Sequence, residues 1–399
     1  MKRNLIITIV TVTILLLFTG AYRILEINTS DLDHVVKVGY IYDGDESAPY
    51  TANFIRAQHA IEKKYEGRVE SVVRSNVPAA SGPEMLSELV AEGCEIIFTT
   101  SYGYQEAAKE CAAANPKVQI CEATGDMANT DPVLSNYHNF MGRIYEGRYA
   151  AGVVAGMKLR QMIDEKVIKP EEAKVGYVAA YPYSEVISGY TAFFLGVRSK
   201  APEAVMTVRY TNTWNNYTLE YENAKEMIKE GCVLISQHSD TIGPAVACEE
   251  AQERHPVYHV GYNQSMIDVA PTRTLVSTRI NWEPYMISAV GAVIDKKNIE
   301  KAVKGDVYGN DACAGFKEGW VEMMELNSQI IADGTREVLD DTVDGFKKGR
   351  IDVFSGAYTG TDPFEPDDRI DLRVSYKENN KASAPSFHYV LDDVITVEE

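Results

Sequence analysis

Ten short apolar runs that alternate with helical stretches constrain the fold of this chain more than any other feature of its sequence. The runs come in two sets of five, separated by helical stretches of 10 to 18 residues. Strands that alternate with helices of this length indicate parallel sheets covered by helices. We therefore expect an α/β fold of two doubly wound parallel-sheet lobes joined by a hinge. The expected strands are Val38–Tyr42, Val69–Val73, Glu95–Thr99, Lys117–Cys121 and Asn136–Met141, then Ala173–Ala179, Val205–Tyr210, Cys232–Gln237, Val257–Gly261 and Thr274–Ile280.

A local duplication supports the two-lobe organisation. Glu92–Cys94 precedes one expected strand of the first lobe, and Glu230–Cys232 precedes the matching strand of the second. A further cysteine follows in each lobe, at Cys111 and at Cys248. Because a helix returns antiparallel to the strand before it, each pair can come close. The candidate disulfides are Cys94–Cys111 and Cys232–Cys248, and four reduced core cysteines are the alternative.

The first residues predict export from the cytoplasm. Lys2 and Arg3 precede an uncharged apolar run from Leu5 to Tyr22, the pattern of a cleaved signal peptide or of an uncleaved membrane anchor. The two remain open, and either places the rest of the chain outside the cytoplasm, anchored to the membrane or secreted to the cell surface or periplasm.

The expected domains follow from these patterns. Residues 1–30 are the signal peptide or anchor, and residues 31–160 plus 283–305 form the first lobe. Residues 170–280 plus 306–360 form the second lobe. Residues 361–399 are a polar extension, expected to be a surface strand pair or a loose tail.

Charge and motif content exclude several classes of protein. The chain carries 39 Lys and Arg against 58 Asp and Glu, a net charge of −19, which argues against binding nucleic acid or an anionic membrane surface. No CxxC pair occurs among the six cysteines. His255 and His259 are separated by a proline in a strand-like stretch, so we expect no metal site there. No cofactor is expected.

The loops after the expected strands carry the candidate ligand-binding residues, because open α/β sheets bind ligands beyond the carboxyl ends of their strands. Aromatic faces stack on a flat ring, and amide or carboxylate groups pair with its edge. Simple packing or helix capping is the alternative role for each side chain, as for Trp282 near the hinge or Asp240 before a helix. The candidates are Tyr50, Ser101, Tyr102, Asp126, Glu185, Trp214, His238, Asp240, Asn263 and Trp282.

Six stretches of the sequence resemble one known family, and the resemblance covers residues 37 to about 360. They are Phe98–Tyr104, Tyr145–Gly152, Val175–Ala180, Tyr210–Trp214, Gln237–Asp240 and Val353–Gly356. Their order and spacing are similar to those of the basic membrane protein family of substrate-binding proteins, which have the type I periplasmic binding fold. Members serve ABC transporters for purine nucleosides and nucleobases, and the nearest branch is associated with adenine-like ligands.

The resemblance implies that five side chains face the ligand, namely Tyr50, Tyr102, Trp214, Asp240 and Asn263. Many members carry Asp where this chain has Asn263, and family members often carry Trp or Phe near the loop that here reads Ala48-Pro49-Tyr50. An amide both donates and accepts hydrogen bonds, whereas a carboxylate only accepts, so the ligand can differ from that of other members.

The sequence therefore favours a binding protein over an enzyme. We expect an extracytoplasmic protein that binds a purine base or nucleoside in a cleft between its lobes and passes it to an ABC transporter permease. A membrane-anchored receptor that presents its ligand to a sensor is the first alternative. An enzyme that cleaves purine nucleosides is the second, although the sequence shows no Ser-His-Asp elbow and no glycine-rich phosphate loop.

Overall fold

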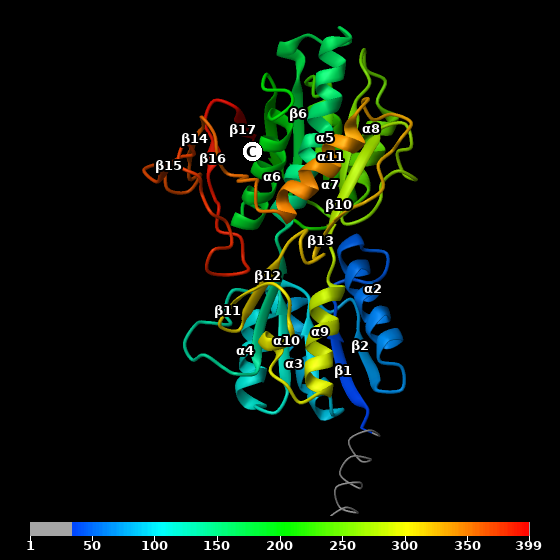
Figure 1. Ribbon diagram of the computed structural model, residues 1–399. Helices are drawn as coiled ribbons and strands as arrows, with labels where there is room; N and C mark the ends of the chain where they lie inside the picture. Colours follow the sequence, from blue (N-terminus) through cyan, green and yellow to red (C-terminus); the bar gives the residue numbers. More distant parts are fainter. Residues whose placement is uncertain (1–33, 399) are drawn as a thin grey trace, which may run out of the picture.

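The computed structural model describes residues 34–398, which form two lobes stacked along the long axis of the molecule (Figure 1). Each lobe contains a seven-stranded sheet, with strand orders β11-β12-β5-β4-β3-β1-β2 and β13-β10-β9-β8-β6-β7-β17. Most neighbouring strands in both sheets are parallel. The predicted α/β fold of two doubly wound lobes is confirmed. The N-terminal segment expected to be a signal peptide or anchor lies outside the described residues.

The first lobe places helices on both faces of its sheet. Its strands are β1 (Val36–Ile41), β2 (Val69–Arg74), β3 (Ile96–Thr99), β4 (Gln119–Ala123), β5 (Tyr137–Gly142), β11 (Asp306–Tyr308) and β12 (Asp311–Ala314). Its helices are α2 (Pro49–Lys64), α3 (Gly82–Ala91), α4 (Gln105–Ala114), α9 (Glu283–Ile294) and α10 (Ile299–Ala302). Successive residues of β3 point to opposite faces, because Ile96 and Phe98 pack with Phe54 of α2 while Ile97 packs with Leu86 of α3. Burial on both faces explains the continuous apolar runs in the sequence.

The second lobe repeats this arrangement. Its strands are β6 (Lys174–Ala179), β7 (Val205–Tyr210), β8 (Leu234–Gln237), β9 (Tyr258–Tyr262), β10 (Thr274–Ile280), β13 (Val321–Met323) and β17 (Ile395–Glu398). Its helices are α5 (Ile144–Asp164), α6 (Ser184–Arg198), α7 (Tyr217–Lys229), α8 (Gly243–Glu250) and α11 (Thr335–Lys347). All ten strands expected from the sequence are present.

Helices α5 and α6 lie in unusually close contact. A methyl group at Gly152 of α5 would lie 1.9 Å from the carbonyl oxygen of Phe193, and one at Gly196 of α6 would lie 2.1 Å from that of Tyr149. Only a hydrogen fits at either position, so these two glycines let the helix backbones touch. This contact fixes α5 on the second lobe.

Two expected domain boundaries differ from the structure. Helix α5 was expected within the first lobe, yet it packs on α6, β10 and α11 of the second. Residues 306–314 were expected in the second lobe, yet β12 pairs in parallel with β5 of the first. Among the described residues, the chain therefore crosses between lobes after β5, after β10 and after β12 (Figure 1).

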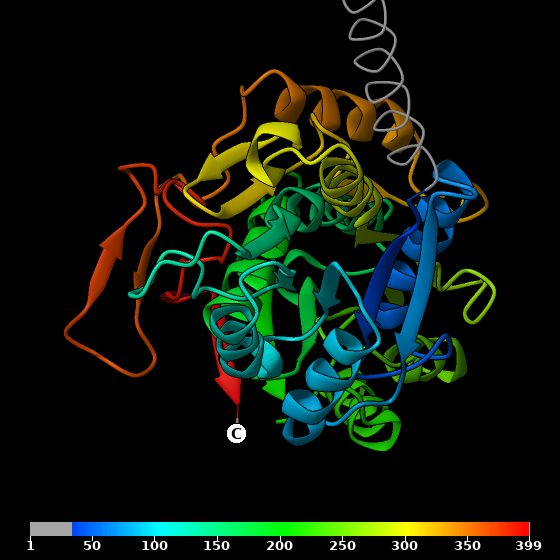
Figure 2. The same cartoon turned by 90° about the horizontal axis from the view of Figure 1, so that it is seen from below.

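The C-terminal extension is more structured than a strand pair or loose tail. Strands β14 (Thr359–Thr361), β15 (Arg369–Asp371) and β16 (Val390–Leu391) form a three-stranded sheet beside the second lobe (Figure 2). Strand β17 then joins the edge of the second sheet, in parallel with β7. Phe387 and Leu391 are fully buried in the main core, which a loose tail would not provide.

The segment before β16 also touches both lobes. The carboxylate of Glu378 accepts a hydrogen bond from the Ser188 hydroxyl of α6 at 2.8 Å. On the first lobe, the Tyr308 hydroxyl donates to the carbonyl of Asn379 at 2.7 Å, and the amide of Ser383 donates to Asp311 at 2.8 Å. The extension therefore forms hydrogen bonds with both lobes and links them beside the hinge.

The two predicted disulfides are wrong. All six cysteines are unbonded in the structure. Cys94 points toward β1, where its sulfur lies 3.2 Å from the position of a methyl group on Gly39, while the helix that carries Cys111 packs over β4. Cys232 and Cys248 share one apolar cluster as separate thiols. The reduced core cysteines that the sequence left as the alternative are observed.

In residues 34–398, none of the helices combines the length and apolar character needed to cross a membrane.

Candidate ligand-binding cleft

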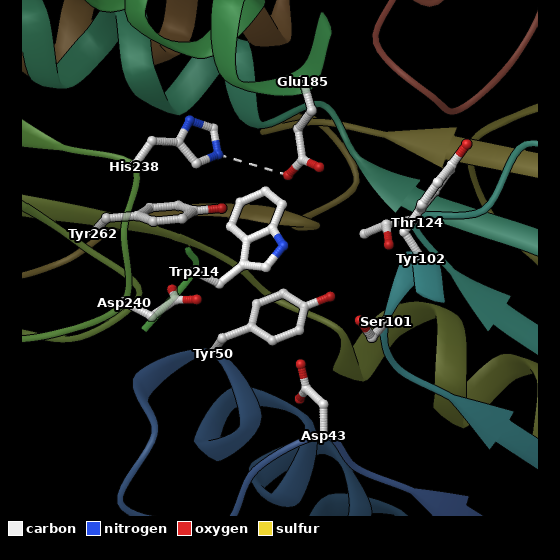
Figure 3. A pocket seen from close by; sticks show the side chains of 10 residues that line it. All are labelled: Asp43, Tyr50, Ser101, Tyr102, Thr124, Glu185, Trp214, His238, Asp240 and Tyr262. Carbon is white, nitrogen blue, oxygen red and sulfur yellow. Dashed lines mark ion pairs between the residues drawn. The ribbon is translucent and has the colours of Figure 1, made fainter. Parts of the chain in front are cut away.

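A cavity lies between the two lobes, where the carboxyl ends of strands from both sheets face each other (Figure 3). The space not filled by atoms amounts to about 450 Å³, part of it open to solvent. The first lobe contributes side chains that follow β1, β3 and β4, and the second contributes side chains near the ends of β6, β7, β8 and β9. The lining residues are Asp43, Tyr50, Ser101, Tyr102, Thr124, Glu185, Trp214, His238, Asp240 and Tyr262.

Aromatic rings form much of the cavity wall. The Tyr50 hydroxyl donates a hydrogen bond to the carbonyl of Thr100 at 2.7 Å, and this bond fixes the ring across the cavity. Trp214 lies 5.5 Å from Tyr181, centroid to centroid, and Tyr262 lies 5.1 Å from His238. Rings held from both lobes offer flat apolar faces to a planar ligand.

Three carboxylates, from Asp43, Glu185 and Asp240, give the cavity its polar character. Burial raises the pKa of Asp240 to about 8, and the nearby carboxylates add to this rise. An opposing effect comes from Asn263, whose side-chain amide donates to Asp240 at 3.0 Å. Burial also raises the pKa of Asp43.

Lysine and arginine are missing from the ten lining residues. The cavity therefore favours a ligand that carries hydrogen-bond donors rather than an anion.

The imidazole of His238 is fully buried beside the cavity. Its Nε2 lies 3.6 Å from the Glu185 carboxylate. Burial, the larger cause, and the charge of Arg148 together lower the pKa of His238 to about 4, against the opposite effect of Glu185. His238 is therefore neutral at physiological pH.

The lobes touch each other at the edge of the cavity. The side-chain amide of Asn53, on α2 of the first lobe, donates to the backbone carbonyl of Asn263 in the second lobe at 2.9 Å. Near the hinge, Arg56 of α2 pairs with Glu283 at 3.1 Å and donates to Asn281 at 3.1 Å. The structure thus shows the two lobes in direct contact at the edge of the cavity.

Comparison with known proteins identifies the family. The family model described as "ABC transporter substrate-binding protein PnrA-like" matches residues 35–346, which include every residue that lines the cavity and all strands of the two seven-stranded sheets except β17. The chain belongs to the PnrA-like family. It is therefore a substrate-binding protein of an ABC transporter and not an enzyme, and it works outside the cytoplasm with transporter components and a small-molecule ligand.

Individual relatives support this assignment. The chain is 29% identical over 323 residues to "Purine-binding protein BAB2_0673" of Brucella abortus, covering 80% of this chain and 83% of that protein. It is 28% identical over 303 residues to "Putative ABC transporter glucose-binding protein TsgA13" of Haloferax volcanii, covering 76% and 69%. A solved solute-binding protein from Aeropyrum pernix shares the fold at a TM-score of 0.64 with 14% identity, covering 79% of this chain and 92% of that one.

Most side chains expected from the sequence to bind the ligand do line the cavity of this family member. They are Tyr50, Ser101, Tyr102, Glu185, Trp214, His238 and Asp240. Asp126 does not, because it is exposed at the surface, where its backbone amide donates to Gln105. Asn263 does not line the cavity, but its side-chain amide donates a hydrogen bond to Asp240, which does.

Trp282 is a core residue rather than part of the cavity wall. Its ring stacks on Phe54 at 4.4 Å and meets Phe140 edge-on at 5.5 Å, and only 1% of the residue is exposed. It also contacts the edge of Tyr50 at 6.4 Å. The hinge packing that the sequence left as an alternative is therefore its observed role.

The sequence-based candidates omitted three lining residues, Asp43, Thr124 and Tyr262. Tyr262 is the last residue of β9, and the other two follow β1 and β4 directly or within two residues. A rule that takes the last strand residue and the two after it finds all three from the observed strand ends. From the expected ends it misses Thr124, because that strand was expected to end at Cys121.

The raised pKa of Asp240 predicts a pH-dependent effect of replacing it by asparagine. The folded protein favours the protonated form of Asp240. The contribution of this preference to the free energy of unfolding is fully present below the ordinary pKa of 3.8 and is lost as the pH rises through about 8. At pH 9 the wild type must bury a charge, and D240N need not. We expect D240N to be more stable than wild type by about 1 kcal/mol or more at pH 9, with little difference at pH 4.

Urea unfolding of both proteins at pH 4, 6.5 and 9 measures this difference. A gap between D240N and wild type that is the same at all three pH values would show that Asp240 ionises normally in the folded protein.

Proposed function

We propose that this protein binds a purine base or nucleoside, with an adenine-like ring, in the cavity between its lobes and delivers it to the permease of an ABC importer. The observation that carries the proposal is the combination of opposed aromatic rings, Tyr50 and Trp214, with the carboxyl group of Asp240 at the same cavity. A purine is flat, so it can stack on the rings. Its edge carries both donors and acceptors, so it can pair with carboxyl groups.

The raised pKa of Asp240 suits this ligand. A carboxyl group with a pKa of about 8 is largely protonated at neutral pH, and a protonated carboxyl both donates and accepts a hydrogen bond. An adenine-like edge, which presents a ring-nitrogen acceptor beside an amino donor, matches that pair of functions. The Brucella relative, named a purine-binding protein, supports the same ligand class.

The N-terminal sequence supports delivery at the membrane. An apolar run after Lys2 and Arg3 would either direct the protein across the membrane or hold it there. In both cases the cavity faces the same compartment as the entrance of an importer. A receptor that presents the ligand to a sensor would use the same cavity and anchor.

Calorimetric titration tests the proposal. The protein is unfolded and refolded to remove any carried ligand and then titrated with adenine, guanine, hypoxanthine, adenosine, guanosine and inosine. Glucose is included because the Haloferax relative is named a glucose-binding protein, and amino acids serve as controls. We expect one purine to bind in the micromolar range or tighter, roughly −8 kcal/mol, and to be recovered unchanged. Binding of glucose but of none of the purines would overturn the proposal.

A further inference from the structure

Arg148 is the most anomalous charged residue near the cavity. It lies on α5, only 1% of it is exposed, and it is among the largest fully buried side chains of the described residues. A buried cation is costly unless a carboxylate pairs with it. In the described part of the chain, no carboxylate forms an ion pair with Arg148. A contribution to the stability of the fold does not explain why this charge is buried, so Arg148 calls for another role.

The guanidinium of Arg148 is held against the back of the cavity wall. Its central carbon lies 3.5 Å from the centroid of the Tyr262 ring, a close cation–π contact. Its Nη1 donates to the carbonyl of Gln237 at 2.7 Å, at the end of β8, while Nε and Nη2 lack protein partners. Arg148 does not itself line the cavity. It therefore reaches the cavity through Tyr262 and through the strand end that carries His238.

The backbone around Arg148 leaves room for this arrangement. A methyl group at Gly189 of α6 would lie 2.7 Å from Nδ1 of His238 and 3.8 Å from Nε of Arg148. The glycine thus lets the imidazole and the guanidinium share one buried space. Both ring nitrogens of His238 lack a hydrogen-bond partner.

Charged and titratable groups face His238 from every side. Arg148 approaches from α5, Glu185 from α6 at 3.6 Å, and Tyr262 from β9. Asp240 lies two residues after His238, in the loop that follows β8, and lines the same cavity. Only Arg148 carries positive charge among these groups. Beside burial, which is the larger effect, Arg148 is therefore the charged group that opposes protonation of His238, whereas Glu185 favours it.

We propose that Arg148 is a positioning residue for ligand binding: it holds the Tyr262 ring in the cavity wall and keeps His238 neutral, so that Glu185 stays free to accept hydrogen bonds from the ligand. If His238 took up a proton, the imidazolium would pair with Glu185 and withdraw its carboxylate from the cavity. The inference about ligand binding rests on the proposed function, but the effect of Arg148 on His238 does not.

Two matched substitutions separate the charge of Arg148 from its bulk. R148M removes the charge and keeps an unbranched side chain, whereas R148K keeps the charge and loses the planar stacking group. The pKa of His238 is read in each protein by NMR of the imidazole, with H238Q used to assign its signal. Affinity for the purine found by calorimetry is then measured at pH 5 and at pH 7.5.

In the wild type and in R148K, we expect His238 to stay neutral above pH 5. In R148M we expect its pKa to rise, while burial, the larger cause of the low value, still holds it below the ordinary 6.5. A His238 pKa of about 6 would make binding at pH 5 about tenfold weaker than at pH 7.5 as a result of His238 alone. Asp240, Asp43 and Glu185 are present in all three proteins, so their titration does not produce the difference. A merely structural role would lower the melting temperature of R148M without shifting the His238 signal.

One result that would overturn the proposal does not depend on the variants folding. An imidazole of His238 that titrates near pH 6.5 in the wild type would show that it is not held neutral. An unchanged His238 pKa in folded R148M would contradict the role of the charge. If no purine binds but His238 titrates as expected, the proposed function fails while the action of Arg148 on His238 stands.

Discussion

Replacing Gly152 by alanine is expected to lower the free energy of unfolding by about 3 kcal/mol or more. The added methyl would lie 1.9 Å from the carbonyl oxygen of Phe193 and 3.1 Å from the amide nitrogen of Val197. Both neighbours are backbone atoms of α6, so no side chain can turn aside and the two helices must separate. Because α5 and α6 pack along much of their length in the second lobe, their separation would disturb the whole lobe.

Gly345→Ala is the matched control for this experiment. Gly345 also lies inside a helix, α11, but a methyl there meets only the flexible end of Ile351, at 2.7 Å. The better helix propensity of alanine offsets part of the crowding, so we expect a change within about 1 kcal/mol. Urea unfolding of both variants measures the difference. Equal stability of G152A and wild type would mean that α5 and α6 lie farther apart than the structure shows.

Trp214→Ala and Asp240→Ala are each expected to weaken purine binding at least tenfold, about 1.4 kcal/mol. Trp214 supplies a large flat face on the second-lobe side of the cavity (Figure 3), and its removal leaves the ligand ring unstacked on that side. Removal of the Asp240 carboxyl deprives the ligand edge of its partner. It also leaves the amide of Asn263, which donates to Asp240 at 3.0 Å, without that acceptor.

Asp126→Ala is the control for the aspartate substitution. It removes the same group from an exposed position that does not line the cavity, so we expect binding to stay within about twofold of wild type. Calorimetric titration of the three variants at one pH gives the comparison. Normal binding by both W214A and D240A would place the ligand somewhere other than this cavity.

The sequence predicts the ten strands because most of them are buried and read as continuous apolar runs, although β2 at the edge of the first sheet has no buried residue. The later strands could not be found in this way. Strands β11 to β17 have two to four residues each, too few for any periodicity. β12 also returns to the first lobe, a pairing that depends on contacts with β5, about 170 residues earlier in the chain. Helix α5 was expected on the wrong lobe for a similar reason. It follows β5 of the first lobe directly in the chain, but it packs on α6, β10 and α11, which come later.

The sequence predicts correctly which side chains line the cavity where their position relative to a strand end determines this, and it fails where tertiary packing determines it. Tyr50 and Trp214 follow from the rule that ligands lie beyond the carboxyl ends of strands. Trp282 obeys the same rule, yet it is covered by Phe54 and Phe140, and only the tertiary contacts show this. Arg148 lies on a helix that the sequence pattern gave no reason to place behind the cavity.

The position of β17 has a consequence for the order in which the protein is made. Residues 395–398 form the outer strand of the second sheet, beside β7. Until these residues leave the ribosome, β7 is an open sheet edge, and such edges invite pairing with other chains. The second sheet is therefore complete only once residues 395–398, about 190 residues after β7, have paired with it, and until then β7 can pair with another chain instead.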